Sequence, residues 1–141
     1  MNVVRVAVFA ACLVLGGCES TEGLAGVWSG TARVSTGIST STFFSLTLTE
    51  TPQGVVSGAG RITTTTPTGQ TNFPATVAGA HAHPAVSLAI TASGATPANF
   101  SGAFDATLSR IHGVLYGSGF FGDSLHLVRN TPGVTARLVE P

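Results

Sequence analysis

A two-residue alternation of apolar and polar side chains runs through most of this chain and limits what it can fold into. It is clearest in Phe44-Ser-Leu-Thr-Leu-Thr49 and again in Val86-Ser-Leu-Ala-Ile-Thr91. In an extended strand, such a pattern places apolar side chains on one face and hydroxyl side chains on the other. From Gly26 onward no helical periodicity is sustained for long enough to form a helix. The pattern therefore predicts an all-β domain.

Clusters of proline and glycine divide the alternation into eight predicted strands. They span residues 26–35, 42–51, 55–65, 72–82, 85–92, 99–108, 111–120 and 124–130. Short connections between them favour an antiparallel up-and-down meander. Pairing the last strand with the first removes both exposed edges and buries the apolar face. We therefore predict an eight-stranded antiparallel meander barrel over residues 26–130, followed by a C-terminal tail, 131–141.

A recurring triplet of a hydrophobic, a small and a glycine residue supports closure of the sheet. Its five copies are Trp28-Ser29-Gly30, Val56-Ser57-Gly58, Val77-Ala78-Gly79, Phe100-Ser101-Gly102 and Ile111-His112-Gly113. Glycine is tolerated inside a strand where the strand bends sharply or another backbone comes close, and barrels need such kinks. Inward-facing Phe44, Phe100, Phe104 and Leu115 would fill the interior, whereas inward-facing glycine and alanine would leave a lumen.

The first 17 residues have the organisation of a secretion signal. Arg5 supplies a positive charge, Val6–Leu15 forms an apolar run, and Gly16 and Gly17 provide small residues at a cleavage site. The apolar run is shorter than the roughly 20 residues that a membrane-spanning helix needs. Residues 1–17 are therefore predicted to be a signal peptide.

Leu15-Gly16-Gly17-Cys18 resembles the lipobox of bacterial lipoproteins. The resemblance implies that Cys18 becomes the first residue of the mature protein and carries acyl chains such as palmitate, which would anchor the domain. Residues 18–25 would then form a lipidated tether. Glu19 after the cysteine implies the outer membrane, with the domain facing the periplasm. The alternative is an ordinary signal peptide followed by an incidental cysteine.

The remaining composition excludes several classes of function. Cys12 leaves with the signal and Cys18 carries the lipid, so the mature domain has no thiol for a disulfide, a metal or a nucleophile. Six basic and six acidic residues give a net charge of zero. A nucleic-acid partner is not expected, because phosphate recognition needs a basic surface.

Two residues at opposite ends of the meander suggest a resemblance to a known group. Gly26-Val27-Trp28 begins the first predicted strand, and Arg129 ends the last. This pattern resembles the calycins, which include lipocalins, avidins and small bacterial inhibitors of metalloproteases. The resemblance implies that Trp28 closes one end of the barrel and that Arg129 packs over the indole in a cation–π contact. The barrel is shorter than a typical lipocalin, and a single tryptophan argues against biotin binding.

The histidines are the strongest metal candidates in the sequence. On a strand, His81 and His83 would point the same way and could share an ion. Because Pro84 follows and no third ligand is near, we expect instead a solvated pair in a turn, with no metal and no cofactor. His112 and His126 lie on adjacent predicted strands and could pair across them.

No constellation in the sequence predicts an enzyme. Glu50 and Asp123 lie near turns, and Asp105 is expected in mid-strand, where it could pair with Arg61 or Arg110. General acid–base chemistry needs two groups that converge on one site, and convergence is not implied here. No nucleophile elbow, phosphate-binding loop or metal-hydrolase motif appears.

Phe120 and Phe121 are expected in the last hairpin turn, where at least one of them should be exposed. An exposed aromatic on a barrel rim could contact a ligand, a partner or the membrane, while the alternative is local packing. Together these features predict a non-enzymatic lipoprotein, held to membrane lipid by Cys18, that binds a small apolar ligand or an envelope partner. The alternatives are a periplasmic protein–protein module such as a protease inhibitor, or a structural envelope protein.

Overall fold

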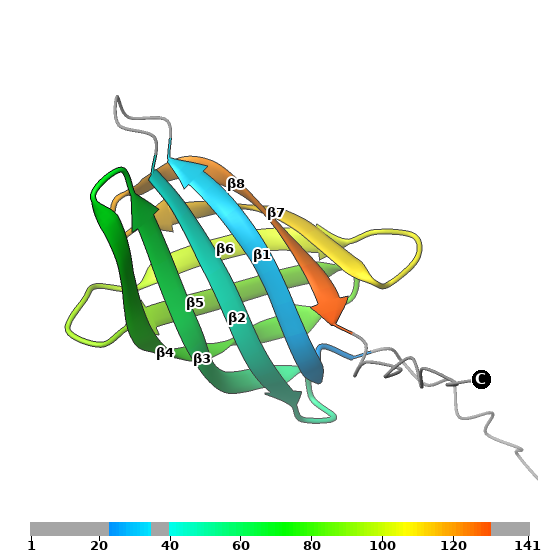
Figure 1. Ribbon diagram of the computed structural model, residues 1–141. Coiled ribbons are helices and arrows are strands. Elements are labelled where there is room, and N and C mark those ends of the chain that lie inside the picture. Colours follow the sequence, from blue (N-terminus) through cyan, green and yellow to red (C-terminus); the bar gives the residue numbers. More distant parts are fainter. Residues whose placement is uncertain (1–22, 35–39, 131–141) are drawn as a thin grey trace, which may run out of the picture.

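The computed structural model describes residues 23–34 and 40–130 and forms one closed antiparallel barrel (Figure 1). Its strands are β1 (Gly26–Val34), β2 (Thr40–Glu50), β3 (Val55–Thr66), β4 (Gly69–Ala82), β5 (Ala85–Ala92), β6 (Ala98–Phe104), β7 (Arg110–Gly117) and β8 (Phe120–Asn130). Each strand pairs with the next along the chain, and β8 pairs with β1. The predicted eight-stranded antiparallel meander barrel is confirmed. The signal peptide, Cys18 and the C-terminal tail lie outside the described residues.

The largest differences from the predicted strands occur around the last three. β6 ends at Phe104, four residues before the predicted end, because the chain turns at Asp105. The Asp105 carboxylate accepts hydrogen bonds from the Thr107 amide and hydroxyl, and Leu108 has a positive φ of 57°. The expectation that Asp105 lies in mid-strand was therefore wrong. β8 begins four residues earlier than predicted, at Phe120.

The side chains that point into the barrel form one apolar core. Burial alternates along β2 and β5, as the two-residue pattern predicts. The largest fully buried side chains are Trp28, Phe44, Phe100, Leu24, Leu46, Leu48, Leu88, Ile90, Ile111, Leu115, Leu125 and Leu127. These side chains come from all but two of the eight strands, and Leu24 comes from the segment before β1. Together they fill the interior over much of the length of the barrel.

Two glycines of the recurring triplet show why this residue is needed. A Cβ atom at Gly79 would lie 2.0 Å from the carbonyl oxygen of Ser87 on the neighbouring strand. A Cβ atom at Gly113 would lie 2.4 Å from the carbonyl oxygen of Ser101 and 2.6 Å from the ring of Phe100. These distances are too short for real atoms, so glycine lets adjacent backbones and one core ring approach closely.

The two ends of the barrel differ in how they are covered. The end that we call the closed end contains the start of β1, the end of β8 and the β2–β3 turn at residues 51–54. The opposite end, the mouth, contains the end of β1, the β5–β6 loop at residues 93–97 and the β7–β8 turn at residues 118–119 (Figure 1). The described chain enters and leaves the barrel at the closed end.

Candidate functional site

A half-enclosed cavity of about 410 Å³ lies at the mouth. Its apolar walls are formed by Val34, Ile62, Phe73, Ile90, Ala92, Ala95, Ala98 and Phe120. Hydroxyl groups enter the lining from Thr40, Thr42, Thr64, Ser93 and Ser118. None of the described residues that line this cavity carries a charge. The mouth therefore offers an apolar surface with a few neutral hydrogen-bonding groups.

The rest of the barrel interior is filled by side chains. Phe44, Phe100, Phe104 and Leu115 are all buried in the core, as one of the two alternatives from the sequence required. The Phe44 ring lies 6.1 Å from the ring of Phe120, which lines the cavity. The two alternatives, a filled interior and an open lumen, thus apply to different parts of one barrel. The barrel is filled toward the closed end and hollow at the mouth.

Small and hydroxyl-bearing residues explain why space remains at the mouth. Inward positions there are occupied by Thr42, Ala92 and Ala98, where the lower barrel has leucine, phenylalanine and tryptophan. Thr42 is a buried polar residue, with 5% of its surface exposed. Its place in the cavity wall makes Thr42 a candidate to orient a bound molecule.

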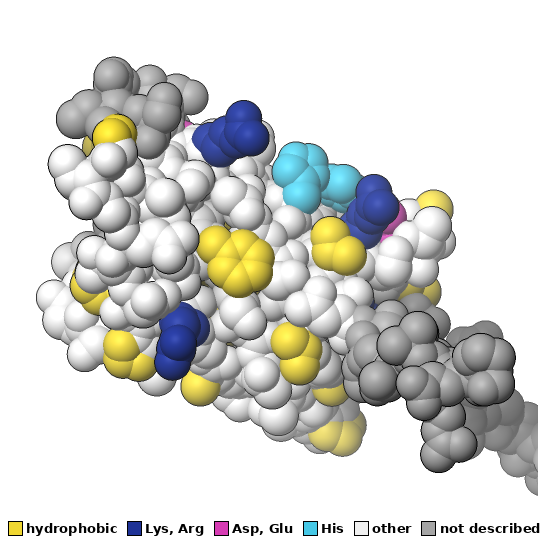
Figure 2. Space-filling model, in the orientation of Figure 1, with side chains coloured by type: hydrophobic (Ala, Val, Ile, Leu, Met, Phe, Trp, Pro, Cys, Tyr) yellow, Lys and Arg dark blue, Asp and Glu magenta, His cyan; other side chains and the backbone are white. Residues whose placement is uncertain are grey.

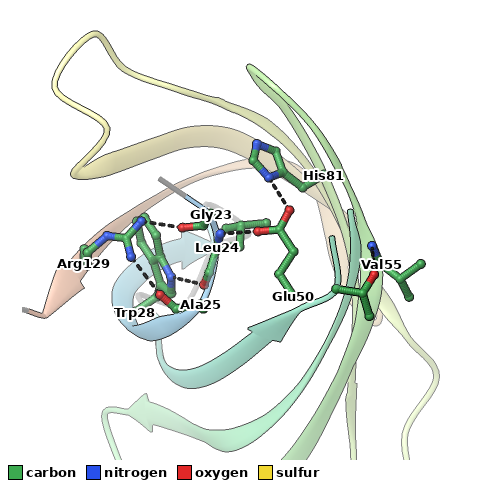
Figure 3. Close-up of polar contacts among 9 residues, drawn as sticks. Gly23, Leu24, Ala25, Trp28, Glu50, Val55, His81 and Arg129 are labelled. Carbon is green, nitrogen blue, oxygen red and sulfur yellow. Dashed lines mark hydrogen bonds and ion pairs between the residues drawn. The ribbon is translucent and has the colours of Figure 1, made fainter. Parts of the chain in front are cut away.

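At the closed end, side chains from β1 and β8 hold the short segment Gly23–Ala25 by its backbone (Figure 3). The Trp28 indole Nε1 donates a hydrogen bond of 2.9 Å to the carbonyl oxygen of Leu24. The two terminal nitrogens of Arg129 donate to the carbonyl oxygens of Ala25 (2.8 Å) and Gly23 (2.7 Å). Leu24 itself is completely buried. Leu24, which the sequence places in the predicted tether 18–25, therefore plugs this end of the barrel.

The contact between Trp28 and Arg129 that the calycin-like pattern implied is present. The two residues face each other directly in the β1–β8 pairing. The central carbon of the Arg129 guanidinium lies 4.5 Å from the centroid of the indole, within the range of a cation–π interaction. The sequence did not indicate that the same guanidinium also binds two carbonyl groups. Its planar fork of donors suits that double role.

Glu50, at the end of β2, contacts the same segment on the side away from Arg129 (Figure 3). Its carboxylate accepts a hydrogen bond of 2.5 Å from the Leu24 amide. The other carboxylate oxygen lies 2.7 Å from Nδ1 of His81, which donates to it when the proton is on that nitrogen. The side chains of His81 and Glu50 are only 8% and 12% exposed. The segment that precedes the barrel is thus held through one amide and three carbonyl groups.

His81 and His83 have different surroundings, and the expectation of a solvated pair holds only for His83. β4 continues through His81, whose ring lies against the Glu50 carboxylate. His81 Nε2 is buried and has no hydrogen-bonding partner among residues 23–34 and 40–130. The two imidazole rings lie 5.9 Å apart. Within the described residues, no three histidine, cysteine, aspartate or glutamate side chains gather in one place.

The aromatic pair at the mouth divides between the inside and the outside of the barrel. Phe120 is 9% exposed and lines the cavity, whereas Phe121 is 81% exposed. The expectation that at least one of the two is exposed is confirmed. Tyr116, which pairs with Phe121 across β7 and β8, is also exposed. The rim therefore presents two neighbouring aromatic side chains to solvent.

The acidic residues in the described part of the chain do not converge on one site. Asp105 lies in the β6–β7 loop at the closed end, while Asp123 lies on β8 near the mouth and accepts a hydrogen bond from the Phe121 amide. Desolvation raises the pKa of the Asp105 carboxyl, but hydrogen bonds from Thr107 and from the backbone of residues 107, 109 and 110 outweigh it. The pKa of Asp105 therefore lies below its ordinary value. Within the described residues, Asp105 forms no ion pair with Arg61 or Arg110.

Comparisons with protein-family models, with curated proteins and with solved structures find no match to this chain. Among the residues that the structure describes, no helix has both the length and the apolar character to cross a bilayer.

Proposed function

We propose that this protein is a bacterial lipoprotein, anchored through acylated Cys18, whose barrel binds a small uncharged ligand at the mouth. The observation that carries the binding proposal is the cavity of about 410 Å³. Binding sites for small molecules typically have volumes of about 300–1,000 Å³ and are lined mostly by apolar side chains. The mouth meets both criteria, while the packed lower barrel supplies a rigid support.

The chemistry of the lining favours a neutral and largely apolar ligand. A charged group placed against these walls would lose its hydration without gaining an opposite charge, which is strongly unfavourable. The threonine and serine hydroxyls can each donate a hydrogen bond to a neutral polar group or accept one from it. The ligand that fits best therefore has an apolar body and one or two hydroxyl or carbonyl groups.

The attachment of Gly23–Ala25 at the closed end supports a definite orientation at the membrane. A fully extended chain spans at most roughly 3.3–3.6 Å per residue, so Gly23 would lie within about 18 Å of Cys18. The closed end would then face the membrane and the mouth would face the periplasm. A ligand could enter or leave without passing between the barrel and the lipid surface.

A second candidate function rests on the exposed rim. Phe121 and Tyr116 form an aromatic pair outside the cavity, and aromatic residues often dominate the energy of protein–protein contacts. In this alternative the protein is a periplasmic binding module, such as a protease inhibitor, and the rim contacts the partner. Substituting Phe121 with alanine would abolish partner binding in this case, whereas binding of a ligand in the cavity would change little.

Binding of the neutral apolar fluorophore N-phenyl-1-naphthylamine tests the ligand proposal. We expect saturable fluorescence enhancement that is lost in Ala92→Phe, because the new ring occupies the cavity. Ala89→Phe is the matched control, since Ala89 lies on the same strand but not in the cavity lining. Equal enhancement in both variants, or none in the wild type, would contradict a ligand site at the mouth.

Mass spectrometry of the mature N-terminus tests the anchor separately. The expected species begins at Cys18 and carries acyl chains, and Cys18→Ser should abolish the modification because it removes the nucleophilic thiol. An unmodified Cys18, or cleavage at another bond, would refute the lipoprotein assignment. Either result would leave the fluorophore experiment interpretable, because the cavity does not depend on the anchor.

A further inference from the structure

His112 and His126 form an exposed cross-strand pair on the outer wall of the barrel. They lie directly opposite each other on β7 and β8, and both are exposed to solvent. Their ring centroids are 4.6 Å apart, their planes are inclined by 79°, and the two Nδ1 atoms are in direct contact. Figure 2 shows histidine side chains together on the surface of this part of the barrel.

The contact between two Nδ1 atoms brings two lone-pair positions to one point. When one Nδ1 carries a proton and the other does not, the first donates that proton in a hydrogen bond to the second. A metal ion can take the place of that proton, because the neutral imidazole nitrogen is a common ligand of zinc, copper and nickel. We propose that His112 and His126 chelate a divalent late transition-metal ion, with water in the remaining coordination positions.

The strands hold the two ligands in place before any ion arrives. Both histidines lie within paired segments of a closed barrel, and their backbones are fixed by the β7–β8 register. Ligands on rigid strands bind with less loss of freedom than ligands on loops. Because both rings are exposed, small rotations can adjust their nitrogens to metal–nitrogen bonds of about 2.0–2.1 Å. The pair therefore needs only local adjustment to accept an ion.

The other histidine pair is less suited to this role. The chain has four histidines, and the remaining two are His81 and His83. Nδ1 of His81 is engaged by Glu50, and its Nε2 is buried at the closed end. An ion would have to open packed structure to reach it. Because His112 and His126 are exposed, a metal ion in solution reaches them without opening packed structure.

The surroundings of the exposed pair predict a labile site. Arg110 lies two residues before His112 on β7 and is exposed on the same face, so its positive charge opposes binding of a cation. Two protein ligands also leave most of the coordination positions to water. We therefore expect an ion that exchanges readily with solution and is not permanently held.

Electron paramagnetic resonance of the full chain with Cu²⁺ tests the proposal, because the spectrum reports the number of coordinated nitrogens. The wild type should show two imidazole nitrogens, and His112→Ala or His126→Ala should leave one. Removing a group that merely orients a metal ligand weakens affinity about 10–100-fold, so loss of a direct ligand should weaken Cu²⁺ binding at least about tenfold. His83→Ala is the matched control and should retain the wild-type spectrum.

Several results would contradict the proposed metal site. These are an unchanged spectrum in His126→Ala, loss of the signal in His83→Ala, or equally tight binding in the double variant His112→Ala/His126→Ala. Metal-free thermal melts keep the comparison valid, since substitutions of these exposed residues should leave the melting temperature close to that of the wild type. If an alanine variant unfolds, His126→Gln retains a neutral polar side chain and provides the same comparison. Mg²⁺, which prefers oxygen ligands, should not compete with Cu²⁺.

Discussion

The closed end and the mouth are built from the same strands, but side chains fill the closed end and leave a cavity at the mouth. At the closed end, Trp28 and Phe104 pack edge to face with ring centroids 5.8 Å apart, and Leu24 is inserted beside them. At the mouth, Thr42 and Ala98 occupy the corresponding inward positions and leave a cavity of about 410 Å³. The alternation of side chains sets which residues point inward. Their size then decides whether an end is sealed or open.

The closed end is sealed with little additional chain. Side chains of Trp28, Glu50 and Arg129 bind the amide of Leu24 and the three carbonyl groups of Gly23–Ala25, so that Leu24 can be buried without leaving its own backbone groups unpaired. Buried backbone groups must find partners, and in this barrel side chains supply them. The mouth has no equivalent cover among the described residues. Stability should therefore depend on the closed end and binding on the mouth.

The largest effect should follow removal of the indole at the closed end. Trp28→Ala deletes a completely buried ring, the donor to Leu24 and the surface on which Arg129 lies. We expect the free energy of unfolding to fall by about 3–5 kcal/mol, as for other large buried aromatic residues. Denaturant unfolding followed by circular dichroism would measure it. A change below about 1 kcal/mol would show that the indole does not close the barrel.

An intermediate effect is expected at Glu50. Glu50→Ala leaves the Leu24 amide and the His81 ring without their acceptor at a site that is almost fully buried. An unsatisfied buried polar group costs about 1–3 kcal/mol, so the loss of stability should fall in that range. Glu50→Gln keeps an acceptor oxygen and should lose less. If both variants were as stable as the wild type, the polar contacts to Leu24 would not contribute to closure.

A smaller effect on stability is expected at the mouth. Thr42→Val keeps the shape of a buried residue in the cavity wall but removes its hydroxyl. We expect the free energy of unfolding to change by less than about 1 kcal/mol, because no packed volume is lost. Binding of a ligand that uses this hydroxyl should weaken by a similar amount. A loss as large as that in Trp28→Ala would mean that the two ends do not divide stability and binding between them.

The smallest effect concerns Asp105 on the β6–β7 loop. Hydrogen bonds to its carboxylate hold the pKa below the ordinary value of 3.8. The unfolded chain therefore binds a proton more readily, so this contribution to stability is present above the ordinary pKa and is lost as the pH falls through the lower folded pKa. Carboxyl chemical shifts followed by NMR should show a low midpoint. Thr107→Val should raise it, and an unaltered midpoint would exclude the Thr107 hydroxyl as a cause.

Much of the barrel could be predicted because its signals are local. The alternation in β2 and β5 and the proline and glycine turns need only neighbouring residues to be recognised, and β5 matches its predicted bounds. The pairing of Trp28 with Arg129 could be anticipated because a meander that closes must bring its first and last strands together. Local period and topology were sufficient for these features.

The contacts of Glu50 with Leu24 and His81 could not be predicted, because they join residues far apart in the sequence. Glu50 and His81 are 31 positions apart and meet only through the barrel register, while Leu24 lies 26 positions before the carboxylate that binds its amide. Nothing in the sequence around His81 distinguishes a buried ring from a solvated one. The cavity likewise depends on which small residues from several strands reach the same level of the barrel.

The most direct test of the division between a sealed end and a binding end is a two-dimensional NMR titration of the protein with N-phenyl-1-naphthylamine. We expect shift changes at the amides of Thr42, Ile62 and Ala98, while the Trp28 indole N–H and the Leu24 amide stay constant. Shifts centred on the indole and Leu24, with none around the cavity, would contradict that division.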